Sequence, residues 1–132
     1  MKYKIVYNDC YGGYALSDKA IDWLAEHGSE RTKQFIAKKR LEASEKIMDY
    51  VSKVRGTADS TRKFYVMDAV RNFLERHDPD LVSVVEALGK EVNDTFSSLA
   101  IEEIDGDEYI IDEYDGRETV LTPEDICWTV IS

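Results

Sequence analysis

The sequence predicts a single α+β domain over residues 1–132, with helices packed on one face of a small, mostly antiparallel sheet. Three observations lead to this fold class. Residues 2–7 alternate tyrosine and isoleucine with lysine and valine, the period of two that indicates a strand. Residues 30–55 contain no glycine or proline and repeat apolar side chains at helical spacing. Residues 99–121 hold three β-rich segments separated by two Asp-Gly pairs, which predicts a C-terminal β-meander that the N-terminal strand joins.

The N-terminal strand is expected to end at Asn8-Asp9 and to lead into the loop Cys10–Tyr14. Two adjacent glycines in this loop allow backbone angles that are closed to other residues. The Ser17 hydroxyl can cap a helix over Asp18–His27, and Gly28 is expected to end it.

The middle of the chain predicts a basic helical segment at about residues 30–76. One long amphipathic helix is expected over residues 30–55, and its apolar seam should pack on Phe64, Met67 or Phe73, or on a second copy of the chain. The seam comprises Ala37, Leu41, Ser44, Met48 and Val51, and Ile36, Ile47 and Val54 widen it. Residues 56–60 interrupt the helix. A second helix over residues 61–76 follows under a Ser60 cap, with a strand over residues 63–67 as the alternative.

The C-terminal half predicts one more helix and then strands. Asp78 followed by Pro79 is typical of a helix start, and Gly89 follows the apolar run that would form its buried face. Strands are expected over residues 99–104, 109–114 and 117–121, with tight turns at Asp105-Gly106 and Asp115-Gly116. Residues 122–125 predict a single helical turn, and residues 127–131 a short extended tail.

The charge of the chain is large and unevenly distributed. Its 17 basic and 27 acidic residues give a formal net charge of −10, which disfavours general nucleic-acid binding. Residues 1–28 carry a net charge of −1, residues 29–63 carry +5 and residues 64–132 carry −14. The opening residues lack the apolar run of a signal peptide and no 18 apolar residues follow one another, so we expect a cytoplasmic protein that does not enter a membrane.

Catalytic and metal-binding patterns are weak. Cys10 and Cys127 lie at opposite ends of the chain without CxxC spacing, and neither His27 nor His77 shows a recognised spacing to a cysteine. We expect two reduced, non-catalytic thiols, no metal site and no cofactor. An enzyme is the third choice, after two kinds of binding protein.

The first kind of binding site is an acidic surface. Residues 102–118 contain nine carboxylates and one basic residue, Arg117. A solvated hairpin would have this composition, but so would a surface that imitates nucleic-acid phosphates or docks on a basic groove. The candidate partner-binding residues are Glu102, Glu103, Asp107, Glu108, Asp112 and Glu113.

The second kind is a small-ligand site at the loop after the first strand. A strand, a glycine-rich turn and a capped helix start can present backbone N–H groups to an anion such as a nucleotide. The loop lacks G-x-G-x-x-G spacing and a P-loop lysine, so a purely structural turn is the competing interpretation. The candidate ligand-binding residues are Asn8, Asp9, Tyr11, Gly12, Gly13 and Ser17.

Several stretches resemble a family of small, uncharacterised proteins encoded by bacteriophages and prophages. They are KIVYNDCYGGYALSDKA near the start, and HDPDLVSVVEALGKEVN, LAIEEI and YIIDEYDGRETV further on. The family opens with N-D-C-Y-G-G-F-x-L-S, so Tyr14 stands where phenylalanine is usual, and residues 30–60 lie outside the resemblance. The resemblance implies phage origin but no activity.

Together these observations predict a phage-encoded accessory protein that acts by stoichiometric binding, as an inhibitor of a host or defence factor with a basic surface. A protein that sequesters a nucleotide or another small anion is the alternative. A homodimer is compatible with either.

Overall fold

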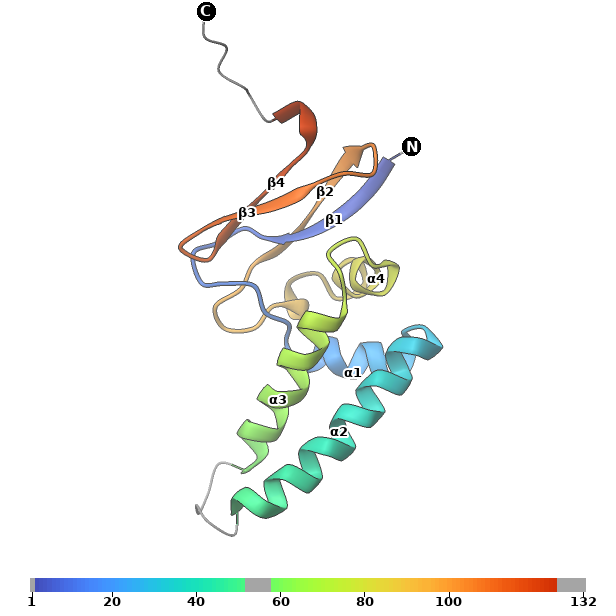
Figure 1. Ribbon diagram of the computed structural model, residues 1–132, viewed down its shortest axis with the longest axis vertical. Helices are drawn as coiled ribbons and strands as arrows, with labels where there is room; N and C mark the ends of the chain where they lie inside the picture. The colour runs from blue at the N-terminus through green and yellow to red at the C-terminus, as the bar shows by residue number, and fades with distance from the viewer. Residues whose placement is uncertain (1, 52–57, 126–132) are drawn as a thin grey trace, which may run out of the picture.

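The computed structural model describes residues 2–51 and 58–125, without the side chains of residues 46–51, 58–62 and 64 (Figure 1). It is an α+β fold, as predicted. Two small antiparallel sheets lie at one end, and the helices lie together on the other side of the first sheet (Figure 1). The helical hairpin of α2 and α3 extends away from the sheets.

Strand β1 (Lys2–Asn8) forms the first sheet with β2 (Leu99–Asp105). The two strands run antiparallel, and Asn8 lies opposite Leu99 at one end of the ladder. Alternate side chains of β1 enter two different cores: Val6 packs among the helices, whereas Ile5 packs against Ile104 and Val120. Because β1 is covered on both faces, it lies between the helices and the second sheet.

Strand β3 (Ile110–Tyr114) forms the second sheet with β4 (Arg117–Leu121). Asp115 and Gly116 connect them with φ angles of 53° and 89°, the two positive values that a type I′ hairpin turn requires. This turn is as predicted. The continuous meander is wrong, because residues 99–105 pair with β1 and the four residues after Asp105 only connect the two sheets.

Local caps set the bounds of two helices. Helix α1 (Asp18–His27) begins where the Ser17 hydroxyl accepts a hydrogen bond from the Ala20 N–H, and it ends at Gly28 as predicted. Helix α4 (Pro79–Leu88) begins after Asp78, whose carboxylate accepts from the Asp80 N–H. A 3₁₀ turn, η1 (Gly89–Val92), follows α4, and a second, η2 (Pro123–Asp125), follows β4.

The basic segment folds into α2 (Glu30–Val51) and α3 (Ala58–Phe73), so the alternative strand over residues 63–67 is wrong. Phe35 stacks on Phe73 with ring centroids 3.9 Å apart. The predicted seam is shifted toward one side: Ile36, expected at its margin, is buried together with Ala43, whereas the central residues Ala37 and Leu41 are exposed, Leu41 to 64%. The side chains of Met48, Val51 and Phe64, and the tail with Cys127, lie outside the described residues.

Ion pairs hold several of the basic side chains of α2 against neighbouring helices. Arg31 contacts Asp78 at 2.6 Å, and Arg40 contacts Asp22 at 2.7 Å. At the start of α2, Asp80 of α4 accepts hydrogen bonds from the Ser29 N–H and from the hydroxyls of Ser29 and Thr32. Part of the positive charge of the middle segment is therefore neutralised within the fold.

Candidate functional site

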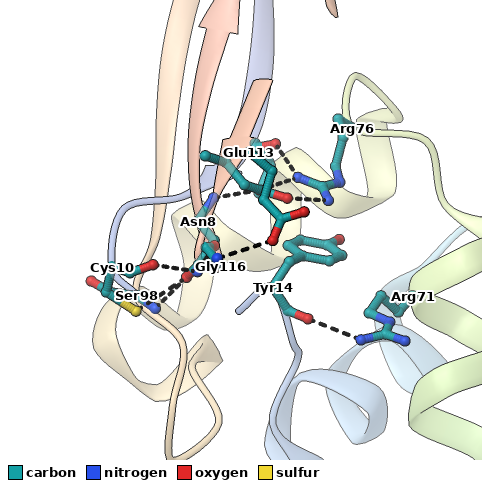
Figure 2. Close-up of polar contacts among 10 residues, drawn as sticks. Asn8, Cys10, Tyr14, Arg71, Arg76, Ser98, Glu113 and Gly116 are labelled. Atoms are coloured by element: carbon teal, nitrogen blue, oxygen red, sulfur yellow. Dashed lines mark hydrogen bonds and ion pairs between the residues drawn. The ribbon is translucent and has the colours of Figure 1, made fainter. Parts of the chain in front are cut away.

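The loop after β1 is tied to both sheets through Asn8. The Asn8 side chain is fully buried, accepts a hydrogen bond from the Ser98 N–H, and donates to the carbonyls of Cys10 and Gly116 (Figure 2). Its backbone N–H donates to Glu118 Oε1 at 2.8 Å. Every polar group of this side chain has a partner, so Asn8 fixes the loop and has no atom left for a ligand.

Arg76, just beyond α3, forms the centre of the adjoining polar network. Its guanidinium donates two hydrogen bonds to the Glu118 carboxylate, at 2.5 and 2.8 Å, and lies 3.6 Å from the centroid of the Tyr14 ring. Desolvation by burial lowers the pKa of Arg76, but its hydrogen bonds to Glu118 and nearby negative charge outweigh this effect, so that the net pKa is raised. Arg76 is therefore a fixed cation whose charge Glu118 neutralises.

Tyr14 lies under Arg76 with a hydroxyl that has no hydrogen-bond partner among the described residues (Figure 2). The side chain is 8% exposed, and this burial raises the pKa of Tyr14 to about 12. Its backbone carbonyl accepts a hydrogen bond from Arg71 of α3. The ring therefore packs as that of a phenylalanine would.

Gly12 of the loop and Gly116 of the β3–β4 turn are needed for close packing. A Cβ on Gly12 would lie 1.7 Å from the Phe96 carbonyl oxygen, and one on Gly116 would lie 2.7 Å from the carbonyl oxygen of Tyr11. The loop and the β3–β4 turn therefore touch backbone to backbone. Gly13, with φ of 102°, has open space around it.

The other residues of the predicted ligand site do not converge on one point. Asp9 is exposed and pairs with Arg117, which also lies over the exposed ring of Tyr11. Ser17 caps α1 and donates its hydroxyl to the Glu91 carbonyl. The structure thus uses Asn8, Gly12 and Ser17 for packing and capping.

A groove of about 940 Å³ opens beside the loop, and we call it the β3 groove. Its walls are residues 12–15, residues 71, 72 and 74–76 at and just beyond the end of α3, and residues 109–111 and 113 of β3 and the connection before it. Asp94 and Phe96 close one side, and Glu118 lies at its base together with Tyr14. Sequence analysis did not find this groove.

Most residues of the predicted acidic surface are exposed, but they do different things. Eight of the nine carboxylates in residues 102–118 are exposed, whereas Glu118 is buried against Arg76. Glu113 accepts a hydrogen bond from the Gly116 N–H and lines the β3 groove. The remaining seven form no hydrogen bond or ion pair with any described residue. One of them, Asp115, lies in the β3–β4 turn, and we call the other six the acidic face: Glu102, Glu103, Asp105, Asp107, Glu108 and Asp112.

The acidic face has few cations close to it. Lys2 and Lys4 lie opposite Asp105 and Glu103 in the β1–β2 register. The Lys4 ammonium, however, pairs with Glu86 of α4 at 3.0 Å. Glu102, Asp107, Glu108 and Asp112 have no basic register partner among the described strands.

Other candidate chemistry has little support from the geometry. The Cys10 thiol contacts the Asn8 side chain and the Phe96 carbonyl, not a base. His77 is within hydrogen-bond distance of Tyr109 and pairs with Glu75, all on the surface. Across residues 2–51 and 58–125, no cluster of His, Cys, Asp and Glu could hold a metal ion, and no helix is long and apolar enough to cross a bilayer.

Comparison of the chain with protein-family models, curated proteins and solved structures finds no match in any of the three. Any proposal about its function therefore rests on the residues and their geometry.

Proposed function

We propose that this chain is a bacteriophage accessory protein that acts by stoichiometric binding in the host cytoplasm. Its partner is a host or defence protein with a basic surface, which the bound chain inhibits. Phage origin is supported by the resemblance of the stretches at both ends of the sequence, and the mode of action by the acidic face.

The observation that carries the proposal is the set of six exposed carboxylates without internal partners. Ion pairs within the fold engage several basic side chains of the helices, but these six carboxylates form no ion pair with a described residue. Like charges this close repel one another, and a basic partner would relieve that repulsion. Such a surface also steers a cationic partner toward the complex.

The alternative, a sequestering protein for a nucleotide or small anion, has less support. The Asn8–Tyr14 loop is occupied by its own packing. Both arginines of the adjoining groove already bind groups of this chain: Arg76 binds Glu118, and Arg71 binds the Tyr14 carbonyl and Asp68. An anion would have to displace these contacts.

The test compares three forms of the protein as bait in a lysate of the bacterial host. One is the wild type; the second neutralises part of the acidic face with Asp107→Asn, Glu108→Gln and Asp112→Asn. The matched control neutralises three exposed helix carboxylates with Glu26→Gln, Glu30→Gln and Glu45→Gln. Retained proteins are identified by mass spectrometry and their affinities measured at low and physiological salt.

We expect a basic protein that the wild type and the control retain equally and that binds the acidic-face variant about tenfold more weakly. Its binding to the wild type should weaken steeply as salt rises, because exposed charges are screened over about 8 Å at 0.15 M. Equal retention by all three forms contradicts the proposal. A small molecule released when the purified protein is denatured would favour the sequestering alternative.

A further inference from the structure

We propose that the β3 groove is where the basic partner docks, and that its occupant is an extended segment of the partner with Lys or Arg side chains flanked by apolar ones. The inference rests on the proposed function and makes it more specific. The acidic face attracts the partner, and the groove holds it.

The charges of the groove favour a cation. Its two arginines are bound within the chain, as described above. Three of its carboxylates can accept further hydrogen bonds. Among the described residues, the Glu75 carboxylate pairs with His77, and no described residue donates a hydrogen bond to the Asp94 carboxylate. Glu113 uses one oxygen to accept the Gly116 N–H and has the other available. A lysine or arginine in the groove would meet three carboxylates with open acceptor positions.

The backbone along the groove favours an extended occupant. Strand β3 pairs only with β4, so its other edge has no strand partner within the described sheets. A two-residue turn makes Tyr114 and Arg117 a hydrogen-bonded pair, and in an antiparallel ladder such pairs alternate. The N–H and C=O groups of Ile111 and Glu113 therefore point away from β4. Both residues line the groove, so a segment lying in it can add to β3 as a further strand.

Apolar side chains at the groove explain why the segment should not be purely basic. Phe96 is 72% exposed and Ile110 is 52% exposed, and both line the groove. Exposed aromatic and aliphatic groups beside a hollow are typical of the anchor points of protein interfaces. A partner whose apolar side chains cover these two residues would bury them while its cations meet the carboxylates.

The test uses the full chain labelled with ¹⁵N and a synthetic peptide of alternating lysine and valine. Peptide binding is followed by amide chemical shifts and by hydrogen exchange. A peptide of alternating glutamate and valine controls for charge, and ATP serves as the anionic probe. The groove variant carries Glu75→Gln, Asp94→Asn and Glu113→Gln, in which glutamine keeps an acceptor for the Gly116 N–H. The acidic-face variant described above is the matched control.

We expect the lysine peptide to shift amides of residues 94–96 and 109–114 and to slow hydrogen exchange at the Ile111 and Glu113 amides. A merely electrostatic contact would not slow these two amides. The groove variant should bind the peptide about tenfold more weakly, with an unchanged circular dichroism spectrum, and the acidic-face variant should lose less affinity at physiological salt.

Two results overturn the inference. Shifts confined to residues 102–108, or none at all, would remove the groove as the docking site; the proposed function would survive if the acidic-face variant still lost the partner from the lysate. Preference of the groove for the glutamate peptide or for ATP would reverse the sign of the occupant and count against the inference and the proposed function together.

Discussion

Replacing Gly116 with alanine is expected to destabilise the chain much more than the same replacement of Gly106. The two residues have nearly equal φ angles, 89° and 88°. At both positions alanine costs left-handed strain and gains some stability because the unfolded chain loses entropy, for a net loss of about 1 kcal/mol. These two contributions cancel when the variants are compared.

The surroundings of the two glycines differ. A Cβ at Gly106 meets nothing within 4 Å, whereas one at Gly116 lies 2.7 Å from the Tyr11 carbonyl oxygen and 2.8 Å from the Gly13 nitrogen. The loop must move by several tenths of an ångström, although the Asn8 side chain holds it to the Gly116 carbonyl. Overpacking of this kind costs about 2 kcal/mol. We therefore expect a loss of about 3 kcal/mol for Gly116→Ala and about 1 kcal/mol for Gly106→Ala.

Thermal and urea unfolding followed by circular dichroism measure this difference. For a chain of this length each kcal/mol lowers Tm by about 4 °C, so the variants should differ by about 8 °C. Equal values of Tm would refute the close contact between the β3–β4 turn and the loop after β1, and with it one wall of the β3 groove.

Three further substitutions probe buried polar groups, two beside the β3 groove and one, Asp80, at the start of α4. Glu118→Gln leaves Arg76 buried without a counter-charge and should lower the free energy of unfolding in urea by about 3 kcal/mol. The control Glu103→Gln, on the exposed surface, should lower it by less than about 0.5 kcal/mol. Similar losses for both would mean that the Arg76–Glu118 pair is effectively in solvent. Tyr14→Phe removes a buried hydroxyl without a described partner and should raise stability by about 1 kcal/mol, and a loss instead would indicate that the hydroxyl is hydrogen-bonded. Burial alone would raise the pKa of Asp80, but hydrogen bonds from Ser29 and Thr32 outweigh it and lower that pKa below 3.8, so its contribution to stability is present above the unfolded-state pKa and is lost as the pH falls through the folded-state value. Asp80→Asn should therefore flatten the dependence of unfolding free energy on pH below about pH 4, and an unchanged slope between pH 5 and pH 2 would contradict this assignment.

Short-range signals predicted the starts of α1 and α4 well, but not that of α3, which begins at Ala58 and not under a Ser60 cap. Ser17 and Asp78 cap α1 and α4 through hydrogen bonds to residues two or three positions further on, so the information is local. The Asp115-Gly116 turn was predictable for the same reason, since its two positive φ angles are required by two adjacent residues.

Long-range choices were not predictable in the same way. Helix α2 has apolar side chains on two neighbouring faces, at Ile36 and at Leu41, and periodicity alone favours neither. Packing against α1 and α3 decides that Ile36 is buried. Likewise, residues 99–105 can pair with the following strand or with β1, and the five residues of β3 pair with β4 through the tighter turn.

The β3 groove could not be predicted because its walls come from distant parts of the chain. Arg71 and Arg76 lie in a basic helical segment where they look like ordinary solvent-exposed charges. Only the fold places them beside Tyr14 and β3. The acidic composition of residues 102–118 predicted the sign of the surface but not that Glu118 is buried and that Glu113 belongs to the groove.

The stretches that resemble the phage family meet one another in the fold. Asn8 and Gly13 of the first stretch lie against Gly116 of the last, and Ser98, just before the LAIEEI stretch, donates to Asn8. These residues therefore build the junction of the two sheets. Residues that hold the fold together in this way need not be the ones that bind a partner.

Asn8→Ala separates these two roles. The substitution removes the acceptor of the Ser98 N–H and the donors to the Cys10 and Gly116 carbonyls. It should lower the free energy of unfolding by about 3 kcal/mol, about 1 kcal/mol for each of the three hydrogen bonds. Measured well below its lowered Tm, the folded variant should bind the lysine peptide with unchanged affinity, because Asn8 has no atom free for a ligand. The groove variant should do the reverse, keeping its Tm and losing affinity. If Asn8→Ala instead weakened binding while Tm stayed the same, the loop would be the ligand site and the β3 groove only its neighbour.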